Sequence, residues 1–198
     1  MAGTLPHAVF VETDLDGGTA VAFAGELPGC AVTGSDPTAA VAGVPARVTA
    51  FVAWLRAHGE TIQEPVGNWY EVERAAATSN GTSRAGFSLD ELPPSPAELA
   101  TWSHWAELAR EDLAAALDEH PDAAESTAWL AEQDAALVAD LGGSVELDVA
   151  GDPIDRLYAA RDALMAALAA PSGHGSVRRA LRLAIADDLR LADQIRGG

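Results

Sequence analysis

The stretch AVFVETDLDGGTAVAFAGELPGCAVTGSDP, at residues 8–37, decides the fold of the N-terminal part of the chain. Short apolar segments at 8–12, 19–24 and 30–33 are rich in β-forming residues. The letters DLDGG and LPG that separate them are typical of tight turns, because Asp, Gly and Pro fit the backbone angles a turn requires. The pattern predicts three short strands that follow one another as a meander.

A helix is predicted directly after the third strand. Ser35 or Asp36 can cap it, and Pro37 suits a first helical position, where no backbone N–H is needed. Apolar residues then recur at helical spacing until Gly59, which is a plausible end. Pro45 removes one backbone hydrogen bond inside this helix, so a kink is expected there.

The composition changes after a last predicted strand at 68–74. Residues 77–95 are rich in Ser, Thr, Gly and Pro, which is typical of a connecting segment. The sequence therefore predicts a small α/β domain at 1–76, a linker at 77–95 and a second domain at 96–198. The fold class expected for the whole chain is α+β.

The second domain has a helical pattern throughout. Its helices are expected at about 96–119, 122–141, 152–169 and 175–196. Short connections between them indicate an antiparallel four-helix bundle. The last helix is expected to turn one face inward. That face comprises Val177, Leu181, Ala184, Asp188, Leu191 and Ile195.

The N-terminal part resembles the HicB family of antitoxin-like domains. The resemblance is carried by VFVE at 9–12, DLDGG at 14–18, ELPGC at 26–30 and VTGSDPTAA at 32–40. It implies a partial ribonuclease-H-like fold of sheet and helix. Some members of the family neutralise a small basic ribonuclease, and many stand alone. The DNA-binding tail usual in such antitoxins is not recognisable in this sequence, which puts autoregulation of an operon in doubt.

The C-terminal part resembles the DinB-like bundles, the superfamily that includes maleylpyruvate isomerase. The stretches FSLD at 87–90, SHWAELAREDL at 103–113, WLAEQD at 129–134 and DDLRLADQI at 187–195 carry this resemblance. It implies a four-helix bundle. Active members hold a divalent metal with three histidines, one on the second helix and two spaced four apart on the fourth.

The three expected metal ligands are missing from this sequence. The positions that match them hold Trp129, Asp187 and Leu191. Indole and leucine side chains offer no lone pair to a metal, and a single Asp does not make a site. The resemblance therefore implies a degenerate metal site, and we expect no metal and no cofactor.

A relocated metal site is the alternative hypothesis. His104 and Glu107 lie three residues apart on the first bundle helix and could supply ligands together with Asp187 or Asp188. If Asp188 instead lies on the inward face, a buried carboxylate requires a charged partner. Four arginines on helices that could face it are available. They are Arg110, Arg156, Arg161 and Arg182.

Catalytic chemistry elsewhere in the chain is not favoured. Cys30 is expected to be a small buried residue, and the only histidine near it in sequence, His7, has no neighbour that would orient it. His58 and His120 stand near predicted helix ends, where a cation is favourable, and His174 is expected in an exposed loop.

Two clusters on the bundle helices are expected to have structural roles. The basic group Arg178, Arg179 and Arg182 is followed by acidic residues and is expected to form a solvated helix face. Trp102 and Trp105, at helical spacing, are expected in the core.

The charge of the chain limits its partners. The formal net charge is -18, and all 12 basic residues are arginines, so the chain should repel a phosphate backbone and no nucleic-acid partner is expected. With one cysteine, no signal peptide and no apolar run of membrane-spanning length, the sequence favours a cytoplasmic protein without membrane contact.

These observations favour a non-enzymatic binding or regulatory protein. It would bind a protein partner or a small molecule, and a homodimer is compatible with the sequence. Two alternatives remain open. One is a diverged DinB-like metal-dependent transferase or isomerase with relocated ligands. The other is an antitoxin-like partner of a small basic toxin.

Overall fold

The structure is a computed structural model of the chain. It describes residues 5–15, 18–77, 85–148, 150–171 and 176–197. The chain divides into two compact units, Met1–Glu91 and Leu92–Gly198. Part of the predicted 14–18 turn, residues 78–84 of the predicted linker, and His174 lie outside the described residues. Together the two units make an α+β chain, as the sequence predicts.

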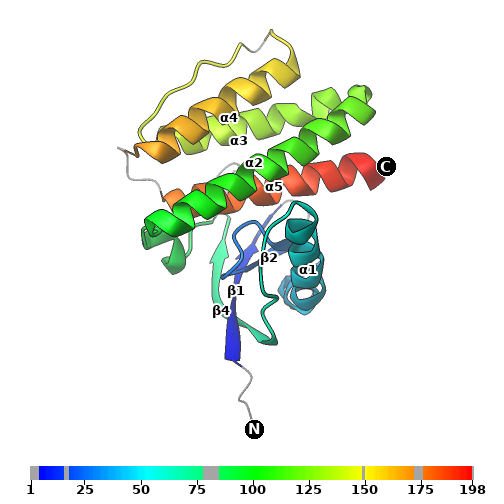
Figure 1. Ribbon diagram of the computed structural model, residues 1–198, viewed down its shortest axis with the longest axis vertical. Helices are drawn as coiled ribbons and strands as arrows, with labels where there is room; N and C mark the ends of the chain where they lie inside the picture. Colours follow the sequence, from blue (N-terminus) through cyan, green and yellow to red (C-terminus); the bar gives the residue numbers. More distant parts are fainter. Residues whose placement is uncertain (1–4, 16–17, 78–84, 149, 172–175, 198) are drawn as a thin grey trace. The chain divides into compact units, whose positions relative to one another are not determined.

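The first unit contains a mixed sheet and one long helix in the part that the structure describes (Figure 1). Its strands are β1 (Leu5–Thr13), β2 (Ala20–Ala24), β3 (Ala31–Gly34) and β4 (Gly67–Ala76). The sheet order is β3-β2-β1-β4. Strand β2 pairs antiparallel with both β1 and β3, which confirms the predicted meander, and β4 pairs parallel to β1.

Helix α1 (Pro37–Ala57) begins as predicted, with the Asp36 side chain accepting a hydrogen bond from the Ala39 N–H at 2.9 Å. It runs as one element through Pro45, an exposed residue. By length and composition alone, α1 is apolar enough to cross a membrane, but a single such helix is weak evidence, because core helices of soluble proteins meet the same criterion. Its buried side chains form one stripe. They are Ala40, Val44, Val48, Phe51, Val52 and Leu55.

A segment at 85–91 completes the first unit. Phe87 is 4% exposed, and its ring lies 5.3 Å from that of Phe10 on β1 and 6.1 Å from that of Phe23 on β2, measured between ring centroids. Phe10 and Phe23 are directly opposed in the β1–β2 pairing, so they share one sheet face. The 85–91 segment therefore covers part of that face.

Three carboxylates hold the 85–91 segment in place. The buried Glu12 accepts a hydrogen bond from the Ala85 N–H at 2.6 Å, and Asp90 accepts one from the Phe87 N–H at 3.0 Å. Glu73 accepts from both the backbone N–H and the hydroxyl of Ser88. The boundary between the units falls inside the predicted linker, yet residues 85–91 are a packed part of the first unit.

The second unit is a bundle of helices α2 (Pro96–Glu119), α3 (Ala128–Asp140), α4 (Pro153–Ala169) and α5 (Val177–Gly197). Helix α2 packs mainly on α5, and α3 mainly on α4. The helix expected at 122–141 is divided, because residues 121–127 form a 3₁₀ helix, η3 (Pro121–Thr127). The hydroxyl of Thr127 donates to the Ala124 carbonyl at 2.7 Å at the junction.

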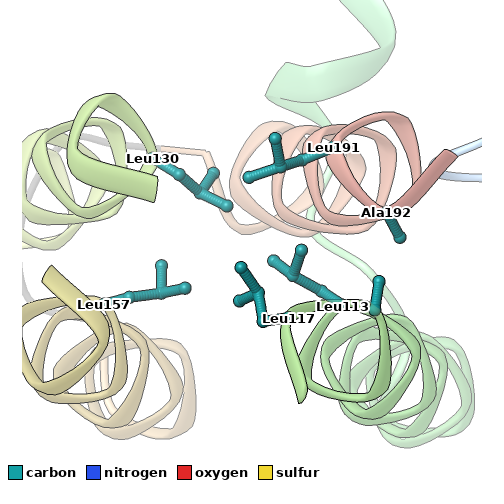
Figure 2. Packing of buried hydrophobic residues seen from close by; sticks show 7 residues of the cluster. Leu113, Leu117, Leu130, Leu157, Leu191 and Ala192 are labelled. Atoms are coloured by element: carbon teal, nitrogen blue, oxygen red, sulfur yellow. The ribbon is translucent and has the colours of Figure 1, made fainter. Parts of the chain in front are cut away.

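Leucines from each bundle helix pack together, as Figure 2 shows. Leu113 and Leu117 come from α2, Leu130 from α3, Leu157 from α4 and Leu191 from α5, and all are at most 7% exposed. Four members of the face predicted for α5 are buried, namely Leu181, Ala184, Asp188 and Leu191. Every residue from Ala180 to Leu189 is buried as well, so burial does not single out that face. The core prediction for Trp102 and Trp105 is confirmed, at 7% and 5% exposed.

Candidate functional site

Four charged side chains, one from each bundle helix, form a cluster in the interior of the second unit. Arg110 comes from α2, Asp134 from α3, Arg161 from α4 and Asp188 from α5. Their exposed fractions are 9%, 1%, 4% and 0%, respectively. We call these side chains the buried quartet. Ionised residues in a bundle core are rare because desolvation is costly, so this cluster is the most unusual chemical feature of the unit.

The two arginines and two aspartates of the quartet bridge one another. Arg161 donates from Nε to Asp134 Oδ2 and from Nη2 to Asp188 Oδ1, both at 2.9 Å. Arg110 donates to both oxygens of Asp188 at 3.2 Å, and its Nη2 lies 3.5 Å from Asp134 Oδ2. The quartet is therefore neutral overall when all four groups are ionised, and it ties four helices together.

Burial dominates the electrostatics of the quartet. It raises the pKa of Asp134 to about 6, although the charges of Arg161 and Arg110 act in the opposite direction. Burial also lowers the pKa of Arg110. Burial alone would lower the pKa of Arg161 too, but Asp134 and Asp188 raise it above the ordinary value. Asp134 therefore changes its charge at about pH 6.

We expect Asp134 to make the stability of the second unit fall as pH rises from about 4 to 7. Its pKa is about 6 in the folded chain against an ordinary value of 3.8. In this window the folded chain holds a proton that the unfolded chain has lost, so each rise in pH favours unfolding, by about 3 kcal/mol in total. Urea denaturation of the native chain and of Asp134→Asn across this range isolates the effect. If the free energies of unfolding of the native chain and of Asp134→Asn differ by the same amount at every pH, the prediction is wrong.

Two of the three positions that match the missing metal ligands lie in or against the leucine cluster. Leu191 belongs to that cluster, and Trp129 packs against it. Asp187 is 4% exposed and forms an ion pair with Arg190 at 3.4 Å. The Arg190 guanidinium in turn lies 4.7 Å from the centre of the Trp129 ring. The Arg190 cation therefore contacts both Trp129 and Asp187, and Leu191 is part of the hydrophobic core.

The structure does not gather the proposed relocated ligands into one metal site. His104 Nδ1 lies 3.5 Å from Glu107 Oε2, but these side chains are 50% and 62% exposed. Asp188 is fully buried and bound by Arg110 and Arg161. Among the residues described, no group of three or more His, Cys, Asp or Glu side chains is arranged to hold a metal ion.

Cys30 is buried, as predicted, at 2% exposed, and burial raises the pKa of its thiol to about 12. Only about one thiol in ten thousand would then be ionised at pH 8, and the thiolate is the reactive form. We expect native protein to resist iodoacetamide at pH 8, whereas protein unfolded in urea takes up one equivalent. Mass spectrometry measures both. Rapid stoichiometric labelling of native protein would show that Cys30 is accessible.

His7 is held in place, contrary to expectation. Its Nδ1 lies 2.8 Å from Glu26 Oε1, and its ring stacks on Trp69 with 4.7 Å between centroids. The imidazole is 7% exposed, and its Nε2 has no hydrogen-bond partner among the described residues. Histidines 58 and 120 follow helices α1 and α2 directly, as predicted.

The arginines at the start of α5 do not form a solvated face, which corrects the sequence prediction. Arg178 lies over the Trp102 ring at 4.6 Å and donates to Glu98, and Arg179 pairs with Asp140 at 3.3 Å. Arg182 is 7% exposed. Glu98 lies on α2 and Asp140 on α3, so Arg178 and Arg179 each pair with an acidic residue of another helix.

The sequence pointed to Arg110, Arg161 and Asp188 but missed Asp134. Asp134 lies four residues after the buried Leu130 and three before the buried Leu137, so it stands on the apolar stripe of α3. This spacing could have identified Asp134 as a buried acidic residue. The polar residues Glu132 and Gln133 just before it made the stretch look exposed.

Comparison with known proteins adds no relative to this picture. No family model, curated protein or solved structure matches the chain significantly.

Proposed function

We propose that this chain is a binding or regulatory protein of the cytoplasm that does not carry out metal-dependent catalysis. Its first unit would supply the binding surface, as a HicB-like domain, and its second unit would be a DinB-like bundle retained as a rigid body. The observation that carries the proposal is the buried quartet. Its two arginines and two aspartates bind one another inside the bundle, where a catalytic site would require groups open to a substrate. Among the described residues, Arg161 Nη1 is the one polar side-chain atom of the quartet that is buried without a hydrogen-bond partner.

The arrangement around Trp129 supports the same proposal. In the resemblance, this position and those of Asp187 and Leu191 would each provide a metal-binding histidine. Here Arg190 lies between Trp129 and Asp187, and Leu191 packs in the leucine cluster. A guanidinium is permanently charged and repels a metal cation. The alternative of a relocated site is disfavoured because His104 and Glu107 are exposed, whereas Asp188 is buried.

The net charge of -18 favours a basic protein as the partner to be tested first. Opposite charge speeds diffusional encounter and excludes like-charged partners. This is the second candidate function, in which the chain acts as an antitoxin-like partner of a small basic toxin. Co-expression with a small basic ribonuclease encoded nearby tests it, and failure to form a complex with any such protein would count against it.

Elemental analysis tests the first proposal. The protein is produced with zinc, nickel and manganese available and purified without chelator, and we expect far less than one metal per chain. About one metal per chain would overturn the proposal. The variants His104→Ala and His120→Ala then show whether His104 is a ligand. Loss of metal in His104→Ala but not in His120→Ala would establish the relocated site. His120 is the matched control since it lies at the other end of α2.

A further inference from the structure

Strand β4 forms one edge of the sheet. No strand lies beyond it among the residues that the structure describes, and it is ten residues long. An edge strand of this length presents a row of backbone N–H and C=O groups to which another strand can add. Val66, Tyr70 and Val72, in or beside β4, are exposed by 81%, 53% and 59%. They are three of the five large apolar side chains that are exposed in the described part of the chain.

An irregularity in β4 sets the direction of its side chains. Val9 pairs with Glu71, but the next residue, Phe10, pairs with Glu73, so Val72 is an extra residue opposite the regular strand β1. In a regular strand, residues three apart point to opposite faces of the sheet. Because of the extra residue, Glu71 and Arg74 share a face, and Arg74 donates to both Glu71 oxygens at 2.8 and 2.7 Å.

We propose that the β4 edge pairs antiparallel with β4 of a second copy of this chain, with Glu71 facing the partner's Arg74. Two adjacent antiparallel strands of identical chains are related by a two-fold axis perpendicular to the sheet, which keeps each side chain on its own face. Directly opposed residues must share a face. When two identical regular strands pair in this way, a residue can face a residue of the partner only if their sequence numbers differ by an even number. The extra residue Val72 makes odd separations across it possible.

Charge complementarity selects the register. Glu71 and Arg74 are an odd number of residues apart, share a face, and have side chains that are 30% and 51% exposed. Because the pairing is symmetric, Glu71 of each copy faces Arg74 of the other. The two contacts together form a group of two glutamates and two arginines. The same register places Tyr70 opposite the partner's Ala75, and Trp69 opposite the partner's Ala76. Large side chains thus meet small ones. The exposed Val72 lies next to the two-fold axis, where pairing would cover it.

Self-association has to overcome the repulsion between two chains that each carry a net charge of -18. At physiological salt, charges more than about 8 Å apart are largely screened, so contact pairs at the edge decide the outcome. Sedimentation velocity in such a buffer measures the dimer. The test uses two charge reversals, Glu71→Arg and Arg74→Glu, each purified separately and then mixed in equal amounts.

We expect the native chain to dimerise and each reversal to weaken the dimer by about 10-fold or more, because like charges then face each other twice. In the mixture, arginines of one variant face glutamates of the other, and dimers should return. Recovery on mixing cannot come from the contact within one chain. The control Glu107→Arg reverses an exposed charge on α2 and should leave the dimer unchanged. Circular dichroism verifies that every variant is folded.

A native chain that stays monomeric at high micromolar concentration would overturn the proposal. A dimer that survives both reversals would overturn it as well, because the contact would then lie elsewhere. Dimers that are lost in each variant and do not return on mixing would show that the reversals act within one chain, which also contradicts the pairing.

Discussion

Replacement of Arg161 by methionine is expected to lower the free energy of unfolding of the second unit by about 3–5 kcal/mol. Arg161 is 4% exposed and binds both Asp134 and Asp188 at 2.9 Å. Without it, two buried carboxylates share Arg110 alone. Methionine has a similar length and adds no charge, so the loss reports the unbalanced carboxylates. Urea denaturation of native and variant chains at pH 7 gives the difference.

A second substitution distinguishes charge imbalance from poor packing. In Arg161→Met with Asp134→Leu, a pair of opposite charges is removed together, and apolar groups of similar size take their place. Such replacements are often close to neutral, so the double variant should recover most of the loss. If it is as unstable as the single variant, the effect comes from packing. Arg196→Met is the matched control, since Arg196 is exposed and donates only to the Asp112 carbonyl in the contacts described.

Low pH should reduce the effect of Arg161→Met. Protonation of Asp134 removes one of the two carboxylates that the substitution leaves in excess, and the pKa of Asp134 is already raised to about 6 in the native chain. The difference in stability between native and variant chains should therefore shrink between pH 7 and pH 5. A difference that grows over this range would contradict the assigned role of Asp134.

Phe87→Ala is expected to destabilise the first unit by about 3–5 kcal/mol, the usual cost of removing a buried phenylalanine. Phe87 is 4% exposed and touches Phe10 and Phe23, so its loss uncovers apolar surface on two strands. Hydrogen exchange at the β1 amides, measured by mass spectrometry, should become faster. Val66→Ala removes an apolar side chain that is 81% exposed, and it should change stability by less than about 0.5 kcal/mol. A loss below about 1 kcal/mol for Phe87→Ala would mean that the 85–91 segment contributes little.

Local patterns in the sequence were sufficient to predict most elements. The short apolar strands, the Asp36 cap of α1 and the bundle helices each follow from neighbouring residues, and the structure has them close to the predicted bounds. The 3₁₀ helix at 121–127 was missed because its composition suits either kind of helix. The parallel placement of β4 beside β1 was not predicted either, because it depends on contacts between residues about sixty positions apart.

The packing of residues 85–91 shows why composition misleads about linkers. The segment follows a stretch rich in Ser, Thr and Gly, and Phe87 and Leu89 are the residues in it that indicate packing. Its hydrogen-bond partners Glu12 and Glu73 belong to distant strands, and nothing in the local sequence marks them as acceptors for a loop. Similarly, the need for an arginine near Asp188 could be argued from burial cost, but the choice of Arg110 and Arg161 among four required the packed helices.

The 85–91 segment has a practical consequence for anyone who wishes to express the two halves separately. A fragment cut after Ala76, where the regular sheet ends, would expose Phe10 and Phe23 and leave the Glu12 carboxylate without the Ala85 amide. Exposed aromatic surface of this kind promotes aggregation. A gene fragment that extends through the codon for Glu91 retains the cover, so the yield of soluble material should depend on fifteen residues that resemble a tether.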